Sequence, residues 1–294
     1  MINWEQVLFN SVVTGSLYLI ASVGLTLTYG LSRFPNFAHA ELMTFGAYMG
    51  YLVTQQLGVS YPVGIAVAFL ASGVLGFLSY RGVFEPLSKR RATIIHLMVA
   101  SIGLGFVVRH VIGQIWGWSP LSFRAVWSSF DVGPLRVTGL WLWIILAALV
   151  LAIVGHFMLT QTKLGKAIRA TSFNPELALA SGININRVTL TTWFLGAAFA
   201  GVAGLFKGSM TKLSPLLGWE IILPAFAVSI LGGVGSFYGS IAAAFIIGLA
   251  ENIGVVLLAN LGISTEYRMA IAFIILIATL IFRPRGLARA FGGA

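Results

Sequence analysis

His39 and Glu41 stand close together ahead of a long apolar run, in the stretch FPNFAHAELMTFGAYMGYLV that begins at Phe34. An imidazole and a carboxylate can transfer protons, bind a metal ion or contact a polar solute. Residues two apart on a helix point to different faces, so this spacing argues against a shared metal site. We expect either that these polar groups fix an irregular helix start after Pro35, or that they line a polar path.

Glu251 is a second acid in an apolar context, and it stands beside Asn252. A carboxylate inside a membrane span is costly, so it faces a partner, the interior of a bundle or a cavity. Glu41 needs a buried arginine or lysine for the same reason, whereas His39 can bond to a backbone carbonyl. Structural pairing and the lining of a path are both open for Glu251.

Catalytic chemistry finds no support in the sequence. It contains no cysteine, no Ser–His–Asp set and no cluster with metal-ligand spacing. The glycine-rich stretch GGVGSFYG, which begins at Gly232, lacks the lysine of a G-x-x-x-x-G-K-[ST] phosphate loop and is interpreted as a tight turn. The chain is therefore predicted not to be an enzyme, to hold no metal or cofactor, and not to hydrolyse ATP itself.

Composition indicates the solvent that surrounds these residues. Hydrophobic residues make up 58% of the 294-residue chain, charged residues make up 9%, and the mean hydropathy is +0.94. Soluble domains carry about 25% charged residues, so we predict an all-α, polytopic integral membrane bundle that forms one domain, 1–294. The net charge of +10 comes from basic residues in short loops, which orient a membrane protein and do not predict nucleic acid as a partner.

A membrane-spanning helix needs about 20 mostly apolar residues. This length predicts about eight spans, near 7–29, 38–57, 62–82, 92–115, 138–160, 188–209, 238–260 and 265–282. The run 219–234 is shorter, contains Pro224 and ends in glycines, which favours one short or broken intramembrane helix. The first apolar stretch lacks a basic n-region and is too long for a signal peptide, so we expect it to be a retained span.

Lysine and arginine predict the orientation of the bundle. Four basic loops should lie in the cytoplasm, and their residues are Arg33; Arg81, Lys89, Arg90 and Arg91; Lys163, Lys166, Arg169 and Arg187; and Arg283, Arg285 and Arg289. An even number of spans must separate these loops, which favours a crossing by 219–234 unless the chain contains another break. The N-terminus and the loop after the fourth span then lie outside, and Arg109 and His110, late in that span, should reach the outer interface.

Small residues recur every four positions at Gly196, Ala200, Gly204 and Gly208. Such a stripe lets two helices approach closely in lipid. Packing within the chain is the favoured interpretation, and a subunit interface is the alternative.

The stretch 161–187 is too polar for a membrane span, yet it contains a helix pattern. Asn174 can cap the helix and Pro175 suits its first position, while Glu176 favours the positive end of the dipole and Gly182 supplies a left-handed stop. A helix of about two turns is not stable alone in water, so it must dock on something. It packs either on its own helix ends or on a cytoplasmic motor subunit.

Four separated stretches resemble bacterial ABC-importer permeases of the branched-chain amino-acid type, the LivH-like family. They are NFAHAELMTFGAYM, GKAIRATSFNPELALASGININRV, LGGVGSFYGSIAAAFIIGLAEN and STEYRMAIAFIILIATLIFRPRGL, and they stand in the family's order. The chain differs from the family at Phe173 and Asn174, where acidic residues usually precede the short helix.

The resemblance implies the partners of the chain. They are a second, related permease subunit in a heterodimer, two cytoplasmic ATPase subunits that bind ATP-Mg, and a periplasmic solute-binding protein, assembled in the bacterial inner membrane. In this interpretation the coupling residues are Asn174, Pro175, Glu176, Leu177, Ala180 and Gly182. The candidate residues of the translocation path or gate are Asn36, Phe37, His39, Glu41, Glu251 and Asn252, and the resemblance does not decide between this role and a structural one.

Other solutes and other classes of function are alternatives to a branched-chain amino-acid importer. Within the family, the solute is most simply a branched-chain amino acid, and urea, short amides and aromatic or other organic acids are alternatives. An ion-coupled carrier or passive channel would need more paired intramembrane charges than Glu41 and Glu251 provide, and would leave the docking loop unexplained. A membrane enzyme would need a catalytic set of side chains that the sequence lacks.

Overall fold

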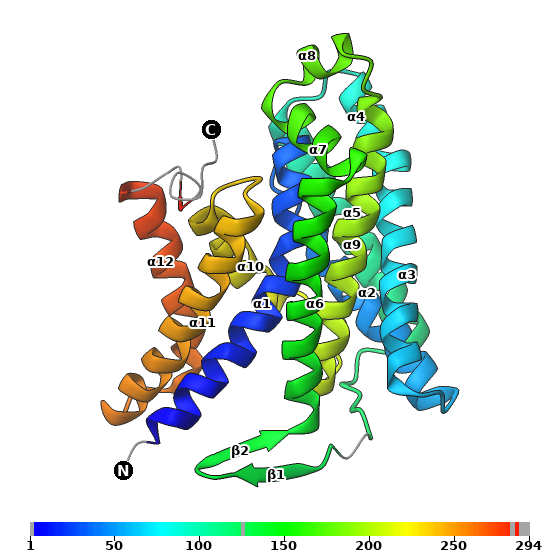
Figure 1. Ribbon diagram of the computed structural model, residues 1–294. Helices are drawn as coiled ribbons and strands as arrows, with labels where there is room; N and C mark the ends of the chain where they lie inside the picture. The colour runs from blue at the N-terminus through cyan, green and yellow to red at the C-terminus, as the bar shows by residue number, and fades with distance from the viewer. Residues whose placement is uncertain (1–2, 125–126, 283–285, 288–294) are drawn as a thin grey trace.

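The computed structural model describes residues 3–124, 127–282 and 286–287. The chain folds almost entirely into helices (Figure 1). The α-helices are α1 (Trp4–Ser32), α2 (His39–Tyr51), α3 (Tyr61–Ser79), α4 (Glu85–Lys89), α5 (Ile94–Trp116), α6 (Gly139–Gln161), α7 (Lys163–Phe173), α8 (Pro175–Ala180), α9 (Ile185–Met210), α10 (Trp219–Gly232), α11 (Phe237–Asn260) and α12 (Arg268–Phe282). Two π-helical turns, η1 (Leu52–Gln56) and η2 (Tyr80–Phe84), extend α2 and α3, and a 3₁₀ turn, η3 (Thr265–Tyr267), precedes α12.

The predicted class, a polytopic helical membrane protein, is confirmed. Within the described residues, seven helical segments are long and apolar enough to cross a membrane: α1, the continuous run from α3 to α4, α5, α6, α9, α11 and the run that ends with α12. The predicted span 38–57 corresponds to α2 with η1, which is not among these seven. The predicted short segment 219–234 corresponds to α10, an apolar helix of 14 residues.

Two groups of three helices, α1 to α3 and α9 to α11, have similar arrangements but run in opposite directions. In Figure 1, α1 rises from the N-terminus at the lower end, whereas α9 descends from the upper end. Each of these long helices is followed by an irregular, proline-containing segment and then by a shorter helix, α2 or α10. The third helix of each group packs along the first helix of the other, α11 on α1 and α3 on α9. Inverted repeats with interrupted helices are typical of membrane transporters.

The two groups are joined where α1 crosses α9. A Cβ atom at Gly24 would lie 2.6 Å from the Cα atom of Gly196, and a Cβ atom at Gly196 would lie 3.1 Å from the Cα atom of Gly24. Neither position has room for a side chain, so the crossing depends on two glycines that face each other. The predicted stripe Gly196, Ala200, Gly204 and Gly208 is buried throughout, and its glycines lie against α1 and α2 of the same chain.

The shorter helices α2 and α10 begin beside each other inside the bundle. The ring Nε2 of His39, the first residue of α2, lies 2.9 Å from the carbonyl oxygen of Ala21, well inside α1. The residue before α10, Gly218, packs on the backbone of Ala40, and its N–H donates to Thr44 Oγ1 at 3.0 Å. Two interrupted helices therefore bring their first turns together within the part of the molecule that a membrane would surround.

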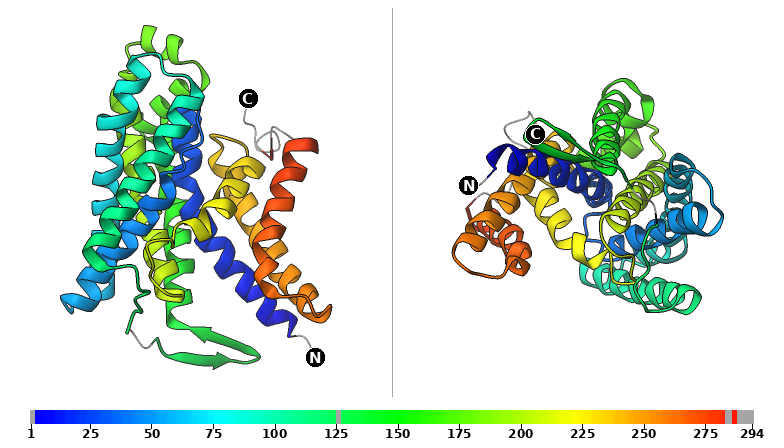
Figure 2. Two further views of the ribbon diagram at one scale, coloured as in Figure 1. Left: turned by 180° about the vertical axis from the view of Figure 1, so that it is seen from behind. Right: turned by 90° about the horizontal axis from the view of Figure 1, so that it is seen from below.

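The two ends of the bundle differ. Helix α8 lies at one end together with α4 and α7, which carry basic residues, and we call this the α8 end; the N-terminus lies at the other end (Figures 1 and 2). This second end, the hairpin end, carries an antiparallel hairpin of β1 (Ser129–Val132) and β2 (Leu135–Thr138), in which Val132 pairs with Leu135. The hairpin was not expected from the helical pattern. Of the predicted cytoplasmic loops, the last one, with Arg283, Arg285 and Arg289, lies outside the described residues.

Candidate functional site

Glu41 lies at the meeting point of α2, α5 and α10, and one of its oxygens receives all the hydrogen bonds that the described residues donate to its side chain. Arg109 on α5 donates from Nε to Glu41 Oε1 at 3.0 Å, and its Nη2 atom contacts the same oxygen. Trp219, the first residue of α10, donates from Nε1 to Oε1 at 2.7 Å. We call these three residues the Glu41 cluster. It links the two interrupted helices to a membrane-spanning helix through one buried carboxylate.

Aromatic rings flank the arginine of the Glu41 cluster. The Arg109 Cζ atom lies 5.1 Å from the Trp219 ring centroid and 5.3 Å from the Phe106 ring centroid. Guanidinium groups are attracted to such ring faces. Because Glu41 is 1% exposed, the negative charge is shielded, while Phe106 and Trp219 keep 49% and 36% of their surface open. The cluster is therefore closed around the carboxylate and open along its aromatic edge.

The start of α2 is fixed by three residues that precede Glu41 in the chain, Asn36, Phe37 and His39. Asn36 and His39 are buried, and Asn36 Oδ1 accepts from the Ala38 N–H at 3.1 Å. The Phe37 N–H donates to Ser101 Oγ of α5 at 3.1 Å. His39 contacts a backbone carbonyl, as expected, and no group of three or more potential metal ligands occurs among the described residues. These contacts hold the irregular segment in place and thereby position Glu41.

Glu251 forms a second buried cluster, on α11 near the hairpin end. Its Oε2 atom accepts from Tyr18 Oη at 2.7 Å and from Arg268 Nε at 2.9 Å. Arg268 also donates from Nη2 to Thr14 Oγ1 at 3.2 Å, and Asn252 donates from Nδ2 to the same oxygen at 3.1 Å. This cluster ties α12 to α1 and α11, and does not share a residue with the Glu41 cluster.

The polar loop at the α8 end contains the predicted short helix. Asn174 Oδ1 accepts from the Leu177 N–H at 3.0 Å, α8 begins at Pro175, and Gly182 has the left-handed φ of 80° that was expected. Ala178 is buried, whereas Leu177 and Leu179 are 61% and 63% exposed. The helix thus uses one small residue to rest on its own chain and leaves its leucines uncovered.

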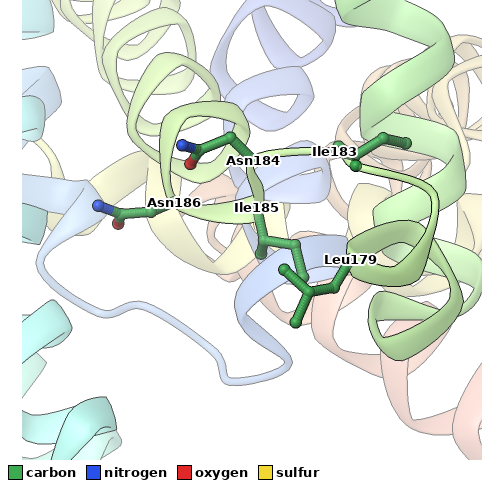
Figure 3. A pocket seen from close by; sticks show the side chains of 6 residues that line it. Leu179, Ile183, Asn184, Ile185 and Asn186 are labelled. Carbon is green, nitrogen blue, oxygen red and sulfur yellow. The ribbon is translucent and has the colours of Figure 1, made fainter.

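A pocket lies between the end of α8 and the start of α9 (Figure 3). Its volume is about 390 Å³, and its lining is Leu179, Gly182, Ile183, Asn184, Ile185 and Asn186. In Figure 3 the side chains of Leu179 and Ile185 lie close together, and those of Asn184 and Asn186 point to the other side. The pocket adjoins the exposed leucines of α8 and extends their apolar surface toward α9.

Comparison with known proteins gives the family. The model of the branched-chain amino acid transport system permease component matches residues 7–280, nearly the whole chain. The chain belongs to this permease family. A probable branched-chain amino acid permease, LivH of Methanocaldococcus jannaschii, is 31% identical, with 96% of this chain and 92% of that protein covered. The LivH permease of Escherichia coli K12 is 28% identical, with 96% and 94% covered.

A permease named for another solute shows a similar level of identity. The ribose import permease RbsC of Escherichia coli K12 is 28% identical, with 93% of this chain and 84% of that protein covered. The percentage identity alone therefore does not separate the two kinds of permease, although the match covers less of the ribose permease than of LivH. The solute must be argued from particular side chains.

The Glu41 cluster corrects one prediction for this permease and adds two residues. Arg109 was expected to reach the outer interface, but it is buried and paired with Glu41, because the carboxylate needs a cation inside the bundle. The expected basic partner of Glu41 is therefore present. Trp219 and Arg268 were not predicted as site residues. Glu251 carried a signal that could have found Arg268, because a buried acid requires a partner and Arg268 opens the next apolar helix.

Proposed function

We propose that this permease is the membrane-spanning subunit of an ATP-binding-cassette importer and provides half of the translocation path for a small polar organic solute. The names of its relatives favour branched-chain amino acids, with urea, short amides and aromatic or other organic acids as alternatives. The partners are a second related permease in a heterodimer, two cytoplasmic ATPase subunits that bind ATP-Mg, and a periplasmic solute-binding protein. The assembly would lie in the bacterial inner membrane.

The uncovered face of α8 is the observation that carries this proposal. A helix of six residues gains too little from its own hydrogen bonds to be stable alone. Leu177, Leu179 and Ala180 are exposed on it, at the end of the bundle that the basic loops assign to the cytoplasm. An ATPase groove that covers these side chains would stabilise the helix and would connect the ATPase mechanically to the permease.

A movement of α8 has a direct route into the bundle. α8 packs on α7, and α7 packs on α6, α9 and α1. Gly165 of α7 lies so close to α6 that an added Cβ atom would be 2.5 Å from the Cα atom of Leu159. Because α7 contacts α9 of one inverted group and α1 of the other, displacement of α7 would act on both groups. Alternating access requires a movement of this kind.

Charged residues on α8 test the proposed coupling. In proteoliposomes with the ATPases and the binding protein, the double variant Leu177→Glu, Ala180→Glu should lose more than nine-tenths of ATP-dependent solute uptake. The ATPase subunits should still hydrolyse ATP, because their catalytic residues are unchanged. The control is Gln161→Glu, an exposed residue at the end of α6, which should transport normally. Uptake at the wild-type rate by the double variant would remove α8 from the mechanism.

A further inference from the structure

Among the described residues, hydrogen-bond donors reach only one of the two carboxylate oxygens of Glu41. Arg109 and Trp219 bond to Oε1, and within the described residues Oε2 is buried and has no hydrogen-bond partner. A carboxylate offers about four acceptor positions, and an unmet buried acceptor is costly. The second oxygen of Glu41 could therefore accept a hydrogen bond from a further donor, which the described residues do not supply.

The Glu41 cluster lies at the depth of the hydrocarbon core of a membrane, where contact between its charges and lipid would be unfavourable. Glu41 is 15 residues before the end of the α2–η1 run at Gln56, which corresponds to about 20 Å of helix at 1.5 Å per residue. The hydrocarbon core of a bilayer is about 30 Å thick, so the cluster falls inside it. Charged groups at this depth face protein or a water-filled cavity. Glu41 and Arg109 meet this requirement by burial in protein, and the exposed rings of Phe106 and Trp219 lie directly beside them.

Three chemical features meet at this edge: a carboxylate with a free oxygen, a guanidinium, and exposed aromatic surface. An aliphatic amino acid presents the matching set, since its ammonium suits Glu41, its carboxylate suits Arg109, and its side chain suits the rings of Phe106 and Trp219. A sugar carries neither charge, so it could not replace either partner of the Glu41–Arg109 ion pair. The match is to a zwitterion with an apolar side chain.

We propose that the Glu41 cluster is a binding site for a zwitterionic aliphatic amino acid on the translocation path. The inference rests on the proposed function and specifies its solute class. In the structure Arg109 and Glu41 form an ion pair with each other, and this pair keeps the site closed. The substrate exchanges this internal pair for two pairs of its own, one to each side chain. In this exchange each buried charge keeps an opposite charge beside it, so the Coulomb attraction within the site is largely retained.

The test measures binding of free solute to the permease–ATPase complex in nanodiscs without the binding protein. The probes are L-leucine, 3-methylbutylamine, which lacks the carboxylate, and 4-methylpentanoate, which lacks the ammonium. L-Leucine should bind saturably, and both analogues should bind at least tenfold more weakly, because each leaves one buried charge unpaired. Glu41→Gln and Arg109→Gln should each weaken L-leucine binding at least tenfold.

Two further variants protect the test against misfolding. Glu85→Gln removes another buried carboxylate, paired with Arg81 and Lys89, and should leave L-leucine binding unchanged. Phe106→Ala removes a ring that is 49% exposed, so the fold is kept, and it should weaken binding of L-leucine more than binding of glycine. Equal binding of L-leucine and its two analogues, unchanged binding by folded Glu41→Gln complex, or no saturable binding would overturn the site. ATP-driven uptake by the wild-type assembly would still support the importer.

Discussion

At the scale of single residues, the permease is organised around carboxylates that are buried with their cations. Glu41 and Glu251 each receive an arginine and one further donor on a single oxygen. Removal of one partner from such a pair is far more harmful than loss of an exposed ion pair, because it leaves a charge uncompensated in a medium of low dielectric constant. The two clusters therefore fix the positions of helices as well as of side chains.

Arg109→Ala should reduce the free energy of unfolding by about 3–5 kcal/mol, because it strands the Glu41 carboxylate. Arg81→Ala is the matched control: the Arg81 side chain is 55% exposed and its partner Glu85 retains Lys89. That control should cost about 0–1 kcal/mol. Thermal unfolding of the purified permease in one detergent measures both. Equal melting temperatures for the two variants would show that the Glu41–Arg109 pair is not a structural element.

At this scale the sequence predicted that Glu41 and Glu251 would need partners inside the bundle, but it did not identify those partners. Glu41 and Glu251 stood out because a carboxylate in an apolar run is costly, and that reason applies without a structure. Arg109 was misplaced because its long side chain satisfies either the membrane interface or a buried acid equally well. Only the packing of α5 on α2 decides between them, and the bond joins residues 68 positions apart.

At the scale of elements, the crossing of α1 and α9 sets the geometry of both inverted groups. Gly24→Ala should destabilise the fold by about 1–3 kcal/mol or prevent it, since the added methyl group meets the backbone of Gly196. Gly103→Ala, in α5, is the control because no atom within 4 Å would meet its Cβ atom. The yield of monodisperse permease and its melting temperature report the difference. A Gly24→Ala permease as stable as Gly103→Ala would mean that the close crossing is unimportant.

Helical elements could be predicted well because hydrophobic length is a strong signal. The predicted runs 138–160 and 188–209 differ from α6 and α9 by only a few residues at each end, and α8 followed from its Asn cap, its proline and Gly182. The hairpin β1–β2 was missed because its strands of four residues carry little periodicity. The meeting of α2 with α10 was also missed, since it depends on how two distant prolines turn the chain.

At the scale of the whole molecule, the proposed coupling would transmit a movement from the α8 end into the bundle. Exposed leucines on α8 are linked through α7 to α6, α9 and α1, while the Glu41 cluster lies where the two inverted groups meet. A force applied at one end of the bundle would therefore open or close the contacts of both interrupted helices. This arrangement gives a physical reason why an ATPase outside the membrane could control a site within it.

The most direct measurement is uptake of L-leucine into proteoliposomes that contain this permease with the proposed second permease and ATPases, with the proposed binding protein added outside. We expect uptake against a concentration gradient when ATP is enclosed, and none when ATP is replaced by a non-hydrolysable analogue. Uptake that proceeds equally without ATP hydrolysis would contradict the account, because it would make the chain a carrier or channel that acts without a motor.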